Sequence, residues 1–124
     1  MKDQEIYKKI GQILYQDSPN IENEVHLVGY IFGGSITTHT WFGNQGRIKE
    51  NVFKLSRDYS MSVSDLLLDL NDYFVENNLG KWNVVYYKLL VKDNKFETEF
   101  EFSDGLANGT LPFWKYVYKF DPKI

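Results

Sequence analysis

Apolar residues recur at helical spacing in two segments of the chain, and they alternate with polar residues along much of the remainder. Residues 3–17 have the spacing of an amphipathic helix, in which one apolar stripe faces the core. The stripe is formed by Ile6, Ile10, Ile13 and Leu14. Ser18-Pro19 is predicted to end this helix, because a residue before proline is disfavoured in the helical region.

A second helix is predicted to begin at Ser62, which is a suitable N-cap. Asp65 lies three residues further on, where a negative charge is favourable near a helix N-terminus. The apolar stripe of this helix consists of Leu66, Leu67, Leu70, Tyr73 and Phe74. The sequence Asn78-Leu79-Gly80 then supplies a C-terminal stop, because asparagine and glycine accept a left-handed backbone.

Four segments have the β-branched and aromatic residues of strands. Residues 25–32 and 36–42 flank Gly33-Gly34, which suits a two-residue hairpin turn with positive φ. Residues 82–91 and 96–102 flank the turn sequence Asp93-Asn94. The sequence thus predicts two antiparallel hairpins.

The remaining segments are less regular. A turn is predicted at residues 43–46 and a further strand around residues 48–55. Residues 103–112 form a polar, glycine-containing loop, and residues 113–120 alternate as a final strand would, with a helix as the alternative. The order helix, strands, helix, strands predicts a single α+β domain over residues 1–124, with a mostly antiparallel sheet packed with two helices.

Composition narrows the class of protein. The chain of 124 residues is 43% apolar and 25% charged, as a folded domain is, and its net charge of −3 gives no overall basic surface for nucleic acid. It contains no cysteine, so disulfides, thiol nucleophiles and cysteine metal sites are excluded. The charged N-terminal sequence lacks a signal-peptide core, and no apolar run reaches the roughly 20 residues of a membrane span. We expect a cytoplasmic protein without a cofactor.

The strand at residues 96–102 carries a row of three glutamates. Glu97, Glu99 and Glu101 point to one face, and Phe96, Phe100 and Phe102 point to the other. A two-residue turn at Asp93-Asn94 predicts the pairs Leu90–Glu97, Lys88–Glu99 and Tyr86–Glu101 on the outer face. It also predicts that Phe100 and Phe102 are buried opposite Tyr87 and Val85.

This row has several possible uses. Side chains two apart on a strand lie about 6.7 Å from each other and do not converge on one metal ion. A glycosidase pair has suitable carboxylate spacing but needs a cleft, which a flat strand face does not offer. The row can also simply solvate an antiparallel sheet. Carboxylates beside Tyr86 and Leu90 are alternatively typical of an interface.

The two histidines of the chain offer an enzymatic alternative. The hairpin register places His26 opposite Trp41 and His39 opposite Val28, so the imidazoles are diagonal neighbours about 7–8 Å apart. Two such histidines could cleave RNA by general acid–base catalysis. No lysine or arginine lies nearby in these strands to stabilise the transition-state charge. Histidines on strands are also common as ordinary packing residues.

Several strings, in order and spacing, resemble the YezG-like bacterial immunity proteins, which are antidotes to secreted polymorphic toxins. They are I-Y-K-K-I-G-Q-I-L-Y, V-G-Y-I-F-G-G-S, the segment Tyr59-Ser60-Met61-Ser62 leading into D-L-N-D-Y-F, Trp82 with the apolar strand after it, D-N-K-F leading into F-E-F, and W-K-Y-V-Y. The resemblance covers nearly the whole chain. It implies a cytoplasmic protein that neutralises a toxin, often a basic nuclease, by stoichiometric binding, with no catalytic residues.

Under this hypothesis the acidic positions form the toxin-binding surface, since complementary charge accelerates encounter and fixes register. The candidate residues are Glu97, Glu99, Glu101, Tyr86, Leu90 and Asp104, with Asp69, Asp72 and Glu76 on the second helix as another patch. No direct contact with nucleic acid or membrane is expected. The alternatives are a small ribonuclease or hydrolase that uses His26 and His39, and a generic protein-interaction domain. The sequence leaves the oligomeric state open.

Overall fold

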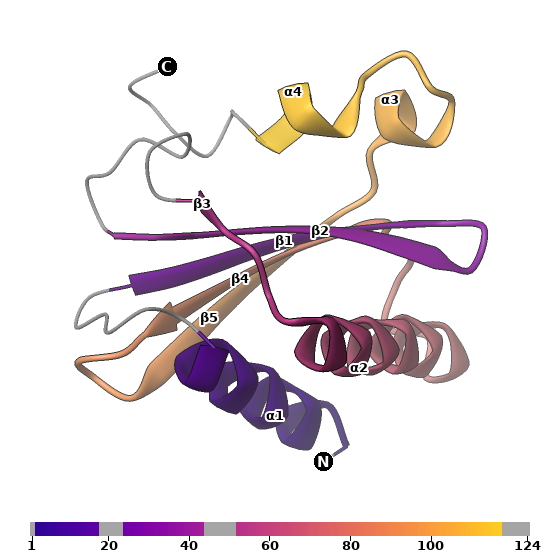
Figure 1. Ribbon diagram of the computed structural model, residues 1–124. Helices are drawn as coiled ribbons and strands as arrows, with labels where there is room; N and C mark the ends of the chain where they lie inside the picture. The colour runs from indigo at the N-terminus through magenta and orange to yellow at the C-terminus, as the bar shows by residue number, and fades with distance from the viewer. Residues whose placement is uncertain (1, 18–23, 44–51, 118–124) are drawn as a thin grey trace.

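The computed structural model is a three-layer domain, in which a five-stranded sheet separates two long helices from a short helical segment (Figure 1). The structure describes residues 2–17, 24–43 and 52–117. The elements in chain order are α1 (Lys2–Asp17), β1 (Glu24–Phe32), β2 (Ser35–Phe42), β3 (Val52–Phe53), α2 (Arg57–Glu76), β4 (Val84–Leu90), β5 (Lys95–Glu101), α3 (Asp104–Ala107) and α4 (Phe113–Val117). The predicted α+β class is confirmed. Within the described ranges, no helix combines the length and apolar character needed to cross a bilayer.

The sheet has the strand order β3-β2-β1-β4-β5, and every pair of neighbours is antiparallel. The first hairpin is as predicted: Gly33 and Gly34 have φ of 58° and 83°, and His26 pairs with Trp41. Of the strand predicted around residues 48–55, the described part is the two-residue β3, which pairs with β2. Residues 48–51 and most of the predicted turn at 43–46 lie outside the described residues.

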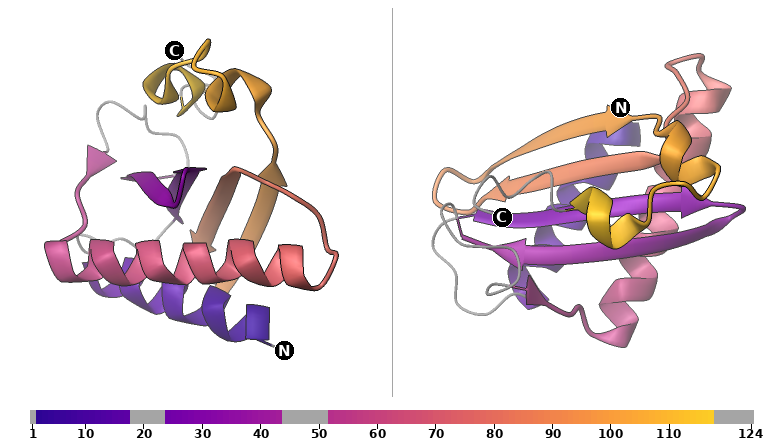
Figure 2. Two further views of the ribbon diagram at one scale, coloured as in Figure 1. Left: turned by 90° about the vertical axis from the view of Figure 1, so that its right-hand side faces the viewer. Right: turned by 90° about the horizontal axis from the view of Figure 1, so that it is seen from above.

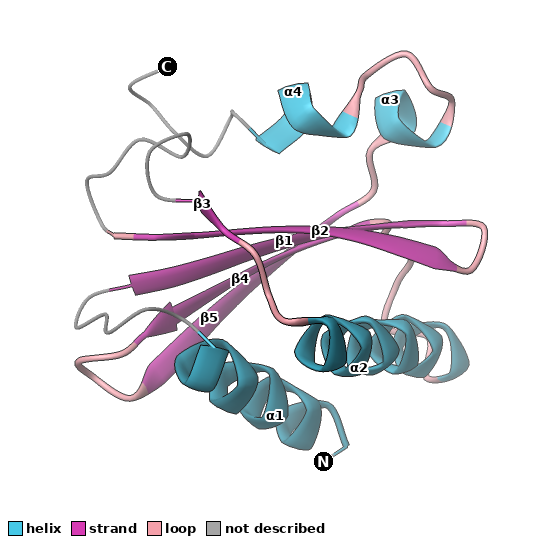
Figure 3. Ribbon diagram, viewed as in Figure 1, coloured by secondary structure: helices cyan, strands magenta, loops and turns pink. Residues whose placement is uncertain are grey.

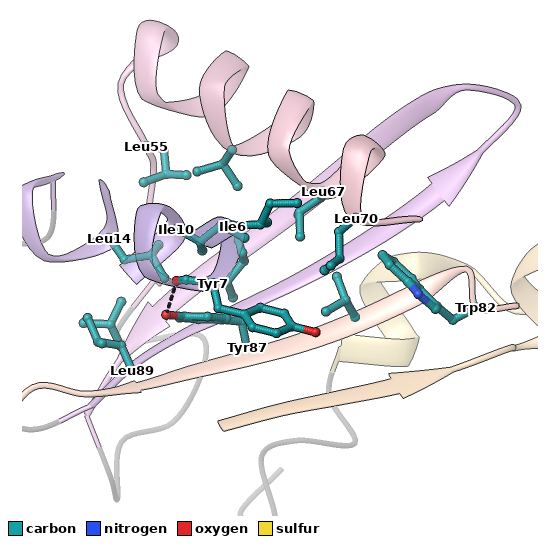
Figure 4. Packing of buried hydrophobic residues seen from close by; sticks show 14 residues of the cluster. Ile6, Tyr7, Ile10, Leu14, Leu55, Leu67, Leu70, Trp82, Tyr87 and Leu89 are labelled. Atoms are coloured by element: carbon teal, nitrogen blue, oxygen red, sulfur yellow. Dashed lines mark hydrogen bonds between the residues drawn. The ribbon is translucent and has the colours of Figure 1, made fainter. Parts of the chain in front are cut away.

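One face of the sheet packs against α1 and α2, as the end-on view shows (Figure 2). The predicted stripe of α1 is confirmed, because Ile6, Ile10 and Leu14 are buried in the main core. Below α1, the hydroxyl of Tyr87 donates a hydrogen bond of 2.8 Å to the carbonyl of Tyr7 (Figure 4). A Cβ at Gly11 would lie 2.7 Å from that hydroxyl, so glycine allows α1 to approach the sheet closely.

Helix α2 begins earlier than the sequence indicated. Its N-cap is Ser56 rather than Ser62, and the Ser56 amide donates to the Asp17 carboxylate at 2.6 Å. Val63 is fully buried beside Leu67 and Leu70, so the apolar stripe begins one turn before Leu66, the first residue of the predicted stripe. At the other end, Asn78 has φ of 55°, as its predicted role in the C-terminal stop requires.

The register of the second hairpin differs from the prediction by two residues. The turn spans the four residues 91–94, with Asn94 at φ of 53° and its amide donating to the Val91 carbonyl. The observed pairs are Leu90–Lys95, Lys88–Glu97, Tyr86–Glu99, Val84–Glu101 and, on the helix side, Leu89–Phe96, Tyr87–Thr98 and Val85–Phe100. A shift of two preserves the face of every side chain. Phe102, however, lies beyond the end of β5 and is 52% exposed rather than buried.

The C-terminal region is helical where a loop and a strand were predicted (Figure 3). The predicted loop at residues 103–112 contains α3, and residues 113–117 form α4, so the helix given as the alternative is found there rather than the strand. Pro112 starts α4, and its carbonyl accepts from the amides of Lys115 and Tyr116. The adjacent residues Tyr116 and Val117 are both buried, which the alternation of a half-exposed strand does not allow. The rest of the predicted strand, residues 118–120, lies outside the described residues.

Candidate functional site

The sheet face turned away from α1 and α2, called the outer face here, carries the predicted glutamate row. Glu97, Glu99 and Glu101 are all exposed on β5, which is the edge strand of the sheet. Tyr86 and Leu90 lie on the same face of β4 and are half-buried. The structure therefore brings together five of the predicted site residues on one hairpin.

The three glutamates have different surroundings. The Glu97 carboxylate forms an ion pair with Lys88 at 3.1 Å, across the strand from it. Glu101 accepts a hydrogen bond from the hydroxyl of Tyr116, and burial together with this carboxylate raises the pKa of Tyr116. Glu99 lies opposite Tyr86 and makes no hydrogen bond or ion pair to another described residue. It is therefore the most available carboxylate of the row.

Part of the outer face is covered by α3, which the sequence did not predict, and by α4, where a helix was the alternative to a strand. A second, smaller core holds this cover in place and contains Val28, Trp41, Val84, Leu106, Tyr116 and Val117. The hydroxyl of Tyr30 adds a hydrogen bond of 2.8 Å to the carbonyl of Leu106. Asp104 is the exposed first residue of α3 and follows β5 after a short connection. Ser103 is the one sequence signal that could have predicted α3, because it is a suitable N-cap residue. In the structure its side chain accepts a hydrogen bond from the Leu106 amide.

Tyr86 does not present a free hydroxyl to a partner. It donates to Nδ1 of His26 at 2.8 Å, while Nε2 of His26 lies 3.0 Å from the Gly43 carbonyl, to which it donates. A carbonyl oxygen only accepts, so Nε2 carries a proton, and in the neutral ring Nδ1 accepts from the Tyr86 hydroxyl. Burial lowers the pKa of His26, although the Glu24 carboxylate 3.3 Å from Nε2 acts in the opposite direction. Burial likewise raises the pKa of Tyr86.

The two histidines do not form an accessible acid–base pair. His26 is only 6% exposed and its ring stacks on Trp41, with centroids 5.0 Å apart. His39 packs against the same indole at 5.8 Å, and burial lowers its pKa. Nε2 of His39 is buried and has no hydrogen-bond partner within the described residues. Across the same ranges, no three histidine, aspartate or glutamate side chains gather as metal ligands would.

The second predicted patch lies on α2, which packs against the sheet face opposite to the outer face (Figure 2). Asp69, Asp72 and Glu76 are exposed, and Asp65 joins them at the helical spacing of one face. The sequence predicts Asp65 only as a charge near the helix N-terminus, because the helix was expected to begin at Ser62 rather than at Ser56. Since the patches occupy different layers, a partner that covers the glutamate row does not reach the α2 patch with the same flat surface.

A surface groove runs between α1 and the β4–β5 hairpin, with a volume of about 540 Å³. Its lining is apolar towards the sheet, from Tyr87, Leu89 and Phe96. Lys8 from α1 and Lys95 from β5 also line it. This groove places an apolar hollow beside the start of the edge strand, on the helix side of the sheet.

No protein-family model matches the chain, and a search of curated proteins found no significant match.

Proposed function

We propose that this protein is an immunity protein, a stoichiometric inhibitor that neutralises a bacterial toxin by direct binding. The proposal depends on one observation above all, which is that three glutamates are exposed along one face of the edge strand β5. Carboxylates in a row attract a basic partner over distances of about a Debye length and orient it at contact. The resemblance to YezG-like immunity proteins is consistent with such a partner.

The toxin class that fits this surface is a basic domain, such as a nuclease that binds phosphates. Glu99 is the central residue of the proposed contact, because no described residue neutralises it by an ion pair. Leu90 adds a half-buried apolar side chain on the same face of the adjacent strand. Tyr86 supports this surface from within by its bond to His26, rather than as a protruding anchor.

The ribonuclease alternative has less support. A general acid–base pair needs two imidazoles that reach the substrate, whereas His26 is buried with both ring nitrogens engaged. The cytoplasmic location belongs to the same proposal, and so does the nuclease class of the toxin, which follows from the resemblance alone.

The test is inhibition of a toxin encoded beside the gene for this chain. The purified toxin domain, assayed on nucleic acid, should lose activity when one equivalent of this protein is added. Cells that express the toxin should survive only when this protein is co-expressed. Undiminished toxin activity at a tenfold excess of the protein would contradict the proposal, and RNA cleavage by the protein itself, abolished in His39→Ala, would favour the enzyme.

A further inference from the structure

The outer edge of β5, the edge that faces away from β4, exposes backbone groups beside the glutamate row. β5 stands at the end of the strand order, so it pairs with β4 alone among the described strands. The Glu101 carbonyl accepts from the Asn83 amide at 3.1 Å, so its backbone groups point towards the β4 side. Backbone direction alternates along an antiparallel strand, so Phe96, Thr98 and Phe100 direct their N–H and C=O groups outward.

We propose that this edge is where the partner binds, by adding an extended segment as a sixth, antiparallel strand. This inference rests on the proposed function for the basic character of the partner. Main-chain hydrogen bonds to an exposed sheet edge supply affinity in such complexes, and alternate side chains supply specificity. β5 is seven residues long and contains no proline. It therefore lacks two of the devices by which proteins block an open edge, which are a very short strand and a proline.

The side chains of β5 define the segment that fits. An added antiparallel strand sets its residues opposite Glu97, Glu99 and Glu101 on the outer face, and cations are favoured there. The residue opposite Lys95 is then favoured to be acidic. On the helix side, apolar residues lie beside Phe96 and Phe100, and the groove of about 540 Å³ begins at Phe96. The occupant is thus an extended partner segment with lysine or arginine alternating with apolar residues.

A second copy of this chain fits the edge less well. Antiparallel pairing over the full length of β5 centres on Thr98, which sets Lys95 opposite Glu101. The same register sets Glu97 opposite Glu99 twice, and like charges directly opposite one another are destabilising. The charge pattern therefore favours a basic heterologous segment over self-association.

The test uses a synthetic peptide and a proline substitution on the intact protein. The peptide Lys-Val-Lys-Thr-Lys-Val-Glu is complementary to β5, and Glu-Val-Glu-Thr-Glu-Val-Lys is its charge-reversed control. Thr98→Pro removes the outward N–H, and proline is tolerated on an edge strand when its N–H would face solvent. Thr98→Ala is the matched control, because it also removes the threonine side chain and keeps the amide.

The complementary peptide should bind wild type and Thr98→Ala at low salt, and should bind Thr98→Pro at least about tenfold more weakly. The control peptide should not bind. On wild type, hydrogen exchange at the Phe96, Thr98 and Phe100 amides should slow when the complementary peptide is added, a readout that does not require the proline variant to fold.

Absence of binding, unchanged exchange at these amides, or dimerisation of the protein through β5 would overturn the inference. Since no toxin enters this test, its failure is separate from that of the proposed function. A toxin inhibited equally by wild type and a folded Thr98→Pro would leave the function standing and reject the strand-addition mode.

Discussion

The hydroxyl of Tyr86 lies 2.8 Å from Nδ1 of His26, so a predicted docking residue and a residue of the enzymatic alternative form one part-buried unit. Tyr86→Phe should leave Nδ1 of His26 without a donor inside the protein. We expect a loss of about 1–3 kcal/mol in the free energy of unfolding, measured by chemical denaturation. The control is Tyr59→Phe, whose hydroxyl bonds to Gln16 at an exposed position. Equal losses in the two variants would show that the Tyr86–His26 bond stabilises the fold no more than the exposed Tyr59–Gln16 bond does.

The histidines predict a pH dependence of stability. Burial lowers the pKa of both His26 and His39 below the unfolded value of about 6.5. The unfolded chain then binds more protons, so their contribution to stability is complete above about pH 6.5 and is lost as the pH falls. The decline should approach about 1.4 kcal/mol per pH unit for each histidine that remains neutral in the folded state.

Urea unfolding at pH 7.5 and pH 5.5 measures this decline. His26→Gln should show a smaller difference between the two pH values than wild type, because one of the two histidines no longer titrates. An unchanged difference would mean that His26 is protonated as readily in the folded protein as in the unfolded chain.

The register of the second hairpin is tested by a charge pair. Lys88 and Glu97 are directly opposite and 3.1 Å apart, and both are partly exposed. A double-mutant cycle with alanine should give a coupling of about 0.2–1 kcal/mol for this pair. The matched cycle for Lys88 and Glu99, the pair that a two-residue turn would create, should give a coupling near zero. A coupling for Lys88 and Glu99 but not for Lys88 and Glu97 would show that the turn has two residues, as the sequence predicted.

The two phenylalanines at the end of β5 should differ in their effect on folding. Phe100 packs against Phe74 and Trp82, with ring centroids 4.8 and 5.0 Å away, so Phe100→Ala should cost about 3 kcal/mol. Phe102 is 52% exposed, and Phe102→Ala should change the free energy of unfolding by less than about 0.5 kcal/mol. Thermal or urea unfolding of both variants checks this, and similar losses would contradict the packing seen at the end of β5.

Much of the main core could be predicted from the chain because its patterns are local. The stripe of Ile6, Ile10 and Leu14 needs only the helical period, and the Gly33-Gly34 turn fixes the first hairpin register. The face of each β5 residue was also predictable, because a shift of two residues leaves the alternation unchanged. The shift itself was not, since the turn length depends on Asn94 adopting positive φ.

The cover over the outer face could not be predicted for a different reason. Trp114 and Tyr116 flank Lys115, as residues on one face of a strand do, and only their tertiary contacts distinguish a strand from a helix. In the structure Tyr116 and Val117 pack on Val28 and Val84, residues that lie far away in the sequence. Tyr116 of this cover donates a hydrogen bond to Glu101. Glu101 and Glu99 therefore have different surroundings, although both belong to the glutamate row.

The most direct test of the proposal that the β5 glutamates bind a toxin is a calorimetric titration. The toxin domain encoded beside the gene for this chain is titrated into wild type, Glu99→Lys and Glu5→Lys. Glu5 is an exposed carboxylate on α1, in the opposite layer, and so is the matched control. Wild type and Glu5→Lys should bind at a ratio of one to one, with affinity that falls as salt is added. Glu99→Lys should bind at least about tenfold more weakly while melting normally. Absence of binding by wild type, or equal affinity of the two lysine variants, would contradict the proposal that the β5 glutamates bind a toxin.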